Sequence, residues 1–218
     1  MLRDRYRAIA SPGLEPPAST LETWALPAAC IAVPPVKQRT NYSCGPAAAL
    51  SLLRHWKREA FAQVEEGDLH DAMGTTIAHG TEPEPMVDAL RRVGGLAAEY
   101  RHGDVTLGQL ERAVDAGQPP IVDLQAWRDT GLGWRETWDA GHYVILVGYD
   151  AERLFVMDPS VMTPGAYAFL PRAELEERWH DVEGTDDTPR ERMAIFVRGR
   201  GPCWPAESLV GTIATRLE

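Results

Sequence analysis

The chain has 218 residues, of which 44% are hydrophobic and 25% charged, a balance typical of a globular protein with one good-sized core. Its formal net charge is −10 and it carries no cluster of lysines and arginines, which argues against duplex nucleic acid as a partner. The excess of acidic residues weakly favours neutral or basic substrates.

The first residues, MLRDRYRAIASPGLEPPAST, lack the apolar run of a signal peptide, and no window approaches the length of a transmembrane helix. The cysteines Cys30, Cys44 and Cys203 form no C-x-x-C pattern, so neither a disulfide framework nor a zinc site is indicated. We therefore expect a cytoplasmic protein that does not contact a membrane. If the protein were exported, Cys30 could pair with Cys203 and leave Cys44 as the free thiol.

One domain is expected over residues 29–200. Residues 1–28 are rich in proline, serine and charge, and we expect them to form an extension that wraps this domain. Residues 201–218 are expected to form a C-terminal tail.

Apolar residues recur at helical spacing after Cys44, where Ser43 is a plausible N-cap and Pro46 suits the first turn. Proline, acids and glycine at their ends indicate further helices at 82–95, 106–117 and 171–179. Apolar β-rich runs predict strands at 30–36 (an edge strand bounded by prolines), 96–100, 119–127, 142–149, 153–158 and 192–198. Helices come mostly first and strands later. This order predicts an α+β fold, with a helical N-terminal half packed on an antiparallel sheet.

The cysteine of QRTNYSCGPAAALSLLRHW (38–56) stands where the first long helix begins. Cysteine most often serves as a small core residue. A helix N-terminus stabilises an anion by only about 0.3–1 kcal/mol, so a thiolate nucleophile at Cys44 also needs a cationic partner, usually a histidine. His55 lies on the same helix some ~16 Å away, at ~1.5 Å per residue, and cannot be that partner.

His142 is the histidine best placed for this role, because it follows a glycine and opens a strongly apolar strand at the rim of the sheet. Asp158 ends the next strand. A three-residue turn between the two strands would place Tyr149 opposite Arg153, and Val144 opposite Asp158. Because side chains alternate, His142 and Asp158 would then share one face, whereas a two-residue turn would separate them.

Gln38 lies six residues before the cysteine, and its amide could donate a hydrogen bond to a developing oxyanion together with the cysteine N–H. Trp127, Trp134 and Trp138 border the loop that precedes the histidine. They either line a substrate groove or anchor the loop.

These residues together resemble a known family. QRTNYSCGPA (38–47), GHYV (141–144) and DP (158–159) are similar in kind, order and spacing to the motifs of the C39 and C39-like cysteine peptidases of the papain-like superfamily. The resemblance spans roughly residues 36–198. DLQAW (123–127), GHYVILVGYD (141–150) and RWHDV (178–182) resemble the stand-alone C39-like branch more than the domain that is fused to peptide-exporting transporters.

The resemblance implies a papain-like fold, with Cys44 as nucleophile, His142 as base, Asp158 as its orienting group and Gln38 in the oxyanion hole. It implies hydrolysis of a peptide or amide bond in a peptide or protein substrate, through a thioester acyl-enzyme and without a metal or organic cofactor. Two alternatives stay open: an acyl or peptidyl transferase that uses the same thioester, and a non-catalytic peptide-binding module.

Overall fold

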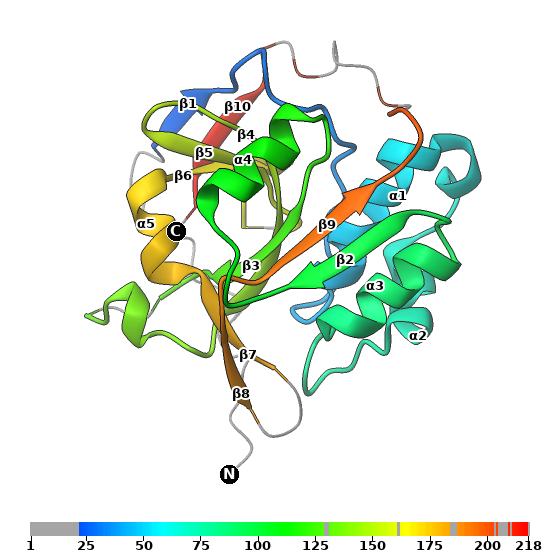
Figure 1. Cartoon of the computed structure of the whole chain (residues 1–218), viewed down its shortest axis with the longest axis horizontal. Coiled ribbons are helices and arrows are strands. Elements are labelled where there is room, and N and C mark those ends of the chain that lie inside the picture. Colours follow the sequence, from blue (N-terminus) through cyan, green and yellow to red (C-terminus); the bar gives the residue numbers. More distant parts are fainter. Residues whose placement is uncertain are drawn as a thin grey trace, which may run out of the picture.

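The computed structural model describes residues 22–128, 131–160, 162–183, 187–202, 204, 209 and 211–217. Figure 1 shows a group of helices beside a large sheet, with further helices over one face of that sheet. The helices are α1 (Cys44–Phe61), α2 (His70–Met73), α3 (Pro83–Arg92), α4 (Leu107–Asp115) and α5 (Arg172–Arg178), with short 3₁₀ turns at Glu66–Leu69, Trp134–Glu136 and Pro164–Ala166.

The large sheet runs in the order β1-β10-β6-β5-β4-β3-β9-β2, and its neighbours are antiparallel except for the parallel pair β10 and β6. Its strands are β1 (Thr23–Ala25), β2 (Ala97–Arg101), β3 (Ile121–Gln125), β4 (Gly141–Tyr149), β5 (Arg153–Met157), β6 (Tyr167–Pro171), β9 (Ala194–Arg198) and β10 (Ile213–Arg216). A separate hairpin consists of β7 (His180–Glu183) and β8 (Thr188–Glu191).

Strand β4 lies in the middle of the sheet and is buried on both faces. Its residues Tyr143, Ile145 and Val147 belong to the core cluster that includes α1, whereas Val144 and Leu146 belong to the cluster that includes α4 and α5. This alternation follows from the pleat of a strand. Burial on both sides explains why β4 reads as a continuous apolar run.

The α+β expectation is confirmed, and so are the helices expected after Cys44 and at 82–95, 106–117 and 171–179. The edge strand expected at 30–36 is wrong, since no strand forms there. Pro34 and Pro35 lack the N–H groups that a ladder requires. The segment instead contacts the sheet through the Ile31 N–H, which donates to the Val147 carbonyl at 2.7 Å, and through the Val33 carbonyl, which accepts the Tyr167 hydroxyl at 2.7 Å.

Both ends of the described chain contribute to the sheet. Strand β1 comes from the segment expected as an extension, and β10 comes from the segment expected as a tail. These two strands pair with each other, and β10 also pairs with β6.

Candidate active site

Cys44 is the first residue of α1, and its side chain is 8% exposed. Pro46 lies in the first turn, as expected. Ser43 occupies the N-cap position, but its side chain does not cap the helix; its hydroxyl instead donates to Glu66 Oε1 at 2.8 Å. The cysteine therefore stands at a helix start whose preceding loop is fixed by a distant carboxylate.

Glu66 is 3% exposed and organises that loop. Its Oε1 also accepts the Arg39 N–H at 2.7 Å, and its Oε2 lies 2.7 Å from His70 Nε2. Hydrogen bonds to a buried carboxylate are stronger than neutral ones, so they hold the segment between Gln38 and Cys44 in place. Sequence reasoning missed Glu66, because nothing in its local segment signals a contact to a loop more than twenty residues earlier.

Gly45 allows the helix start to pack closely against the loop that contains Thr81. A Cβ at Gly45 would lie 2.7 Å from Thr81 Cβ and 2.9 Å from Met86 Cε, distances that side chains do not tolerate. A glycine after the cysteine is therefore required by this close approach.

His142 is the second residue of β4 and is 1% exposed, and Asp158 directly follows β5 and is fully buried. His142 Nε2 lies 2.6 Å from Asp158 Oδ1. Asp158 Oδ1 also accepts the Ser160 N–H at 2.8 Å, and Asp158 Oδ2 accepts the hydroxyl of Thr163. Lys37, which sequence reasoning also missed, donates to the Thr163 carbonyl at 2.7 Å. The loop that carries the aspartate is thus held from several sides.

The β4–β5 hairpin gives the pairing of Val144 and Asp158 that the sequence predicted, but its turn has a different length. Tyr149 pairs with Leu154 and not with Arg153, so the turn is one residue longer than expected. An irregularity between Leu146 and Gly148 absorbs the extra residue in β4, and Ile145 then pairs with Met157. Continued to the end of β5, this register sets Val144 opposite Asp158, as expected.

His142 interacts with both Asp158 and Cys44. Burial lowers the pKa of His142, but the charge of Asp158 and hydrogen bonds to Asp158 and Cys44 outweigh it and raise that pKa to about 9. Burial works against ionisation of Asp158 too, yet the His142 charge and hydrogen bond lower the pKa of that carboxyl below its ordinary value. Because Nε2 faces the aspartate, Nδ1 is the nitrogen left for the Cys44 thiol. At neutral pH the pair is an imidazolium and a carboxylate.

Gln38 is 4% exposed and lies next to the aspartate loop, since its N–H donates to the Pro159 carbonyl at 2.9 Å. Its Nε2 donates one hydrogen to the Thr40 carbonyl at 2.8 Å. A primary amide has two such hydrogens, so a second donor remains on the same nitrogen.

The three candidate tryptophans occupy three different environments. Trp127 packs on His142 with ring centroids 4.7 Å apart, at a backbone φ of 57° that is unusual for a bulky residue. Trp138 lines the cleft beside the cysteine. Trp134 is 5% exposed, and the guanidinium carbon of Arg178 lies 3.8 Å from the centroid of its ring.

His180 is buried, and its Nε2 lies 2.7 Å from the Thr137 carbonyl.

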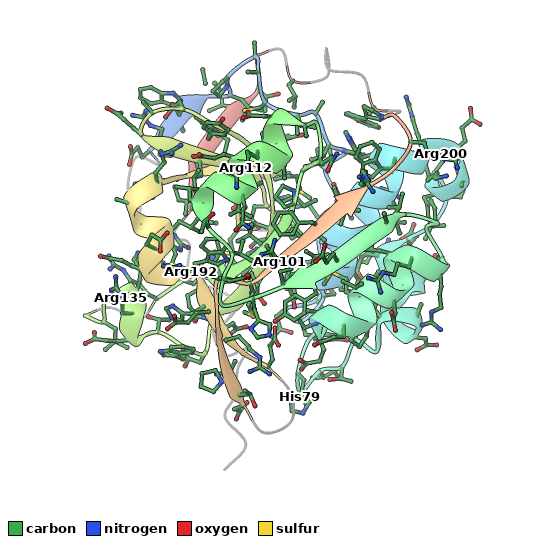
Figure 2. The ribbon with its side chains drawn as sticks, viewed as in Figure 1. His79, Arg101, Arg112, Arg135, Arg192 and Arg200 are labelled. Atoms are coloured by element: carbon green, nitrogen blue, oxygen red, sulfur yellow. The ribbon has the colours of Figure 1, made fainter. Side chains whose placement is uncertain are left out.

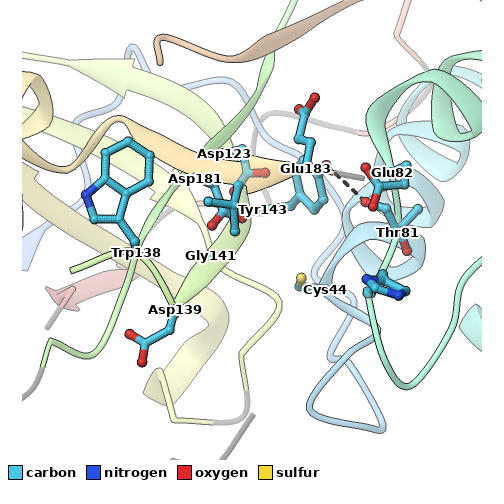
Figure 3. Close-up of a pocket in the computed structure, with 13 residues that line it drawn as sticks. Cys44, Thr81, Glu82, Asp123, Trp138, Asp139, Gly141, Tyr143, Asp181 and Glu183 are labelled. Carbon is cyan, nitrogen blue, oxygen red and sulfur yellow. Dashed lines mark hydrogen bonds between the residues drawn. The ribbon is translucent and has the colours of Figure 1, made fainter. Parts of the chain in front are cut away.

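A cleft of about 40 Å³ opens beside Cys44. Figure 3 shows Asp123, Tyr143 and Asp181 on the sheet side and Thr81 on the opposite wall. The Tyr143 hydroxyl donates to the Thr81 carbonyl at 3.1 Å and so joins the two walls. The thiol of Cys44 is reachable from this cleft, as a nucleophile must be.

A cysteine, a histidine and an aspartate in this mutual arrangement are the groups on which thiol-dependent hydrolases rely. The model of the Peptidase_C39 like family matches residues 30–186, and the chain therefore belongs to that family of peptidases. A search of curated protein sequences found no match.

Solved structures with a similar fold come from the same group of peptidases. One is described as a C39-like peptidase from Bacillus anthracis (TM-score 0.56, 18% identity, 78% of this chain and 96% of that chain covered). Another is the peptidase domain of Streptococcus ComA, a bi-functional ABC transporter (TM-score 0.53, 19% identity, 76% of this chain and 98% of that chain covered). A third is a double glycine motif protease from an AMS/PCAT transporter, in complex with a leader peptide (TM-score 0.51, 15% identity, 78% of this chain and 94% of that chain covered). These likenesses establish the papain-like fold.

Within the described ranges, no helix combines the length and the apolar character needed to cross a membrane.

Proposed function

We propose that this protein is a cysteine peptidase in which Cys44, His142 and Asp158 cleave a peptide or amide bond. The observation that carries the proposal is the buried pair of His142 and Asp158, whose Nε2 and Oδ1 lie 2.6 Å apart, with Cys44 close enough to contribute to the raised pKa of His142. Family membership supports the peptidase activity. The leader peptide bound to one structural neighbour supports a peptide as substrate.

In the first half of the reaction, His142 carries the thiol proton of Cys44, in keeping with its imidazolium form at neutral pH, and the sulfur attacks the carbonyl carbon. The C–S bond forms, and the oxyanion accepts hydrogen bonds from the Cys44 N–H and the second Nε2 hydrogen of Gln38. The C–N bond then breaks, and His142 gives its proton to the leaving amine. Asp158 holds the imidazole in the required tautomer and stabilises its charged form.

In the second half, His142 deprotonates a water molecule that attacks the thioester, and the acid product and free thiol are released. The acyl-enzyme intermediate is the thioester on Cys44. We further propose that the protein works in a reducing cytoplasm, with Cys44 and Cys30 as the free thiols that the structure contains.

Incubation of the protein with a native peptide extract, followed by mass spectrometry of new peptide ends, tests this function. The wild type should generate new ends, Cys44→Ala should generate none, and Cys30→Ala should match the wild type, because Cys30 lies in the core. Cleavage that persists in Cys44→Ala would refute the assignment. New ends that carry an added amine in place of water would show transfer instead of hydrolysis.

A further inference from the structure

The cleft beside Cys44 carries acidic groups that the proposed catalysis does not use. In the described part of the chain, its lining includes no lysine or arginine but several carboxylic acids, namely Glu82, Asp123, Asp139, Asp181 and Glu183. Figure 3 shows these acids around the cysteine. His79 also lines this cleft, and Figure 2 shows it at a distance from the arginines that are labelled there. A substrate that approaches Cys44 therefore meets a negative surface.

Most of these acids have partners within the protein. Asp181 Oδ1 accepts Gln125 Nε2 at 3.0 Å. Glu183 Oε1 accepts the Tyr100 hydroxyl at 2.5 Å, and Glu183 Oε2 lies 3.5 Å from Arg190 Nε. These carboxylates are held by the hairpin and the sheet and do not by themselves call for a ligand.

Asp123 differs from the other acids. It is 4% exposed, and its Oδ1 has no hydrogen-bond partner among the described residues. It sits directly opposite Tyr143 in the β3–β4 ladder, so the two side chains share the face on which Cys44 lies, and the Tyr143 hydroxyl contacts its carboxyl. A buried acceptor without a donor costs free energy, which favours a ligand that supplies one.

Activation of the nucleophile does not explain this carboxyl. A negative charge beside Cys44 would oppose formation of a thiolate. The remainder of β3 is buried and mostly apolar, so an apolar residue at position 123 would be the simpler choice for folding.

We infer that Asp123 receives a primary ammonium group of the substrate, either a lysine side chain or the N-terminus of the peptide, close to the bond that Cys44 attacks. This inference rests on the proposed function, since it names the class of peptide that the same site selects. An ammonium is a compact charge that suits one unpaired oxygen beside a small cleft, whereas the guanidinium of arginine is best matched by two acceptors.

The electrostatics of the free protein agree with this assignment. Burial, reinforced by the charge of Asp181, raises the pKa of Asp123 well above its usual range, so the free protein favours the neutral carboxyl. A bound ammonium supplies the opposite charge that allows the carboxyl to ionise. Asparagine resembles the protonated carboxyl in size and polarity, so Asp123→Asn should fold normally and lose only the ammonium site.

Cleavage of two degenerate octapeptide pools, one N-acetylated and one with free N-termini, tests the inference by mass spectrometry. A charged hydrogen bond typically raises affinity roughly ten- to a hundred-fold. At one position near the cut bond, peptides with lysine should therefore be cleaved at least about ten-fold more than peptides with norleucine. If the N-terminus is the ammonium, the free pool should instead be cut near its terminus and the acetylated pool spared. In Asp123→Asn, the ratio of cleavage that expresses either preference should fall to about one. Asp104→Asn, an equal charge change at an exposed site outside the cleft, should keep it.

The outcomes separate this inference from the proposed function. Cys44-dependent cleavage that treats lysine, norleucine and both termini alike would overturn the inference and leave the peptidase standing. A preference for arginine over lysine would also overturn it. If the wild type cleaves nothing, fluorescence anisotropy is used to compare the binding of labelled lysine peptides and labelled norleucine peptides to Cys44→Ala. A preference for lysine lost on Asp123→Asn would support the ammonium site and count against the peptidase, and equal binding would overturn the inference as well.

Discussion

Replacement of Asp158 by asparagine should remove the cause of the high pKa of His142. Asparagine keeps the size of the side chain, and its oxygen can still accept the N–H of Ser160. The negative charge is lost, however, and burial, which lowers the pKa of His142, is then opposed only by the contact with Cys44. We expect the pKa of His142 to fall from about 9 to 6.5 or below. This drop of about 2.5 pH units corresponds to about 3 kcal/mol of lost preference for the imidazolium.

The assay is an NMR titration of ¹³C-labelled histidine between pH 5 and pH 10. In the wild type, the resonance assigned to His142 through its absence in His142→Gln should titrate near pH 9. His55 serves as an internal control, because burial lowers its pKa to about 4 and it should stay neutral throughout. A resonance of His142 that still titrates near pH 9 in Asp158→Asn would refute the reasoning.

The same shift predicts how stability depends on pH. The pKa of His142 is higher in the folded state than its unfolded value of about 6.5, so its interaction with Asp158 stabilises the fold fully below that pH. This contribution is lost as the pH rises through about 9. The free energy of unfolding of the wild type should therefore exceed that of Asp158→Asn most clearly near pH 6, and urea denaturation at pH 6 and pH 9.5 should show the difference shrink.

Three further predictions follow from individual contacts. Gly141→Ala should lower peptide cleavage while the fold persists, because its Cβ would lie 1.8 Å from Asp181 Oδ2 and must displace that carboxyl, which Gln125 holds. Gly67→Ala, with open space around it, should have no effect. Unchanged cleavage by the Gly141 variant would show that the position of the Asp181 carboxyl does not matter to the site. Gln38→Ala should lower kcat by about 10²–10³ with little change in KM, and an unchanged kcat would remove its oxyanion role. Asp123→Asn should raise the thermal unfolding temperature increasingly as the pH rises above about 4, because the wild-type carboxyl must take up a proton to fold; a gain that is constant with pH would be inconsistent with its raised pKa.

The elements around the catalytic candidates could be predicted because their signals are local. Helix α1 shows apolar residues at helical spacing, and β4 is a long apolar run between a glycine and an acid. The sequence allowed the pairing of His142 with Asp158, through alternation along a hairpin, but did not require it. The length of the turn could not be predicted, since a bulge can shift a register without leaving any mark in the sequence.

What the sequence could not reveal depends on contacts between distant segments. Glu66 and Lys37 read as ordinary charged residues, although one holds the loop before Cys44 and the other holds the loop after Asp158. Strand β10 is only four residues long, and β1 and β6 pair with it from both sides. Asp123 did carry a signal, a single acid within an apolar strand, but its meaning depends on its position beside the cysteine.

The central claim is that His142 activates Cys44, and brief labelling with iodoacetamide at about pH 6 tests it most directly. A free thiol with a pKa of about 8.5 is well under about one per cent ionised at that pH. Burial, with a smaller effect of Asp150, raises the pKa of Cys30 to about 12, so Cys30 should stay unlabelled. Peptide mapping should find that Cys44 is labelled before Cys30 and Cys203. The His142→Ala variant should lose most of that preference, since a helix end alone contributes about one pKa unit or less. Equal labelling of the three cysteines, or unchanged labelling of Cys44 in His142→Ala, would contradict the account.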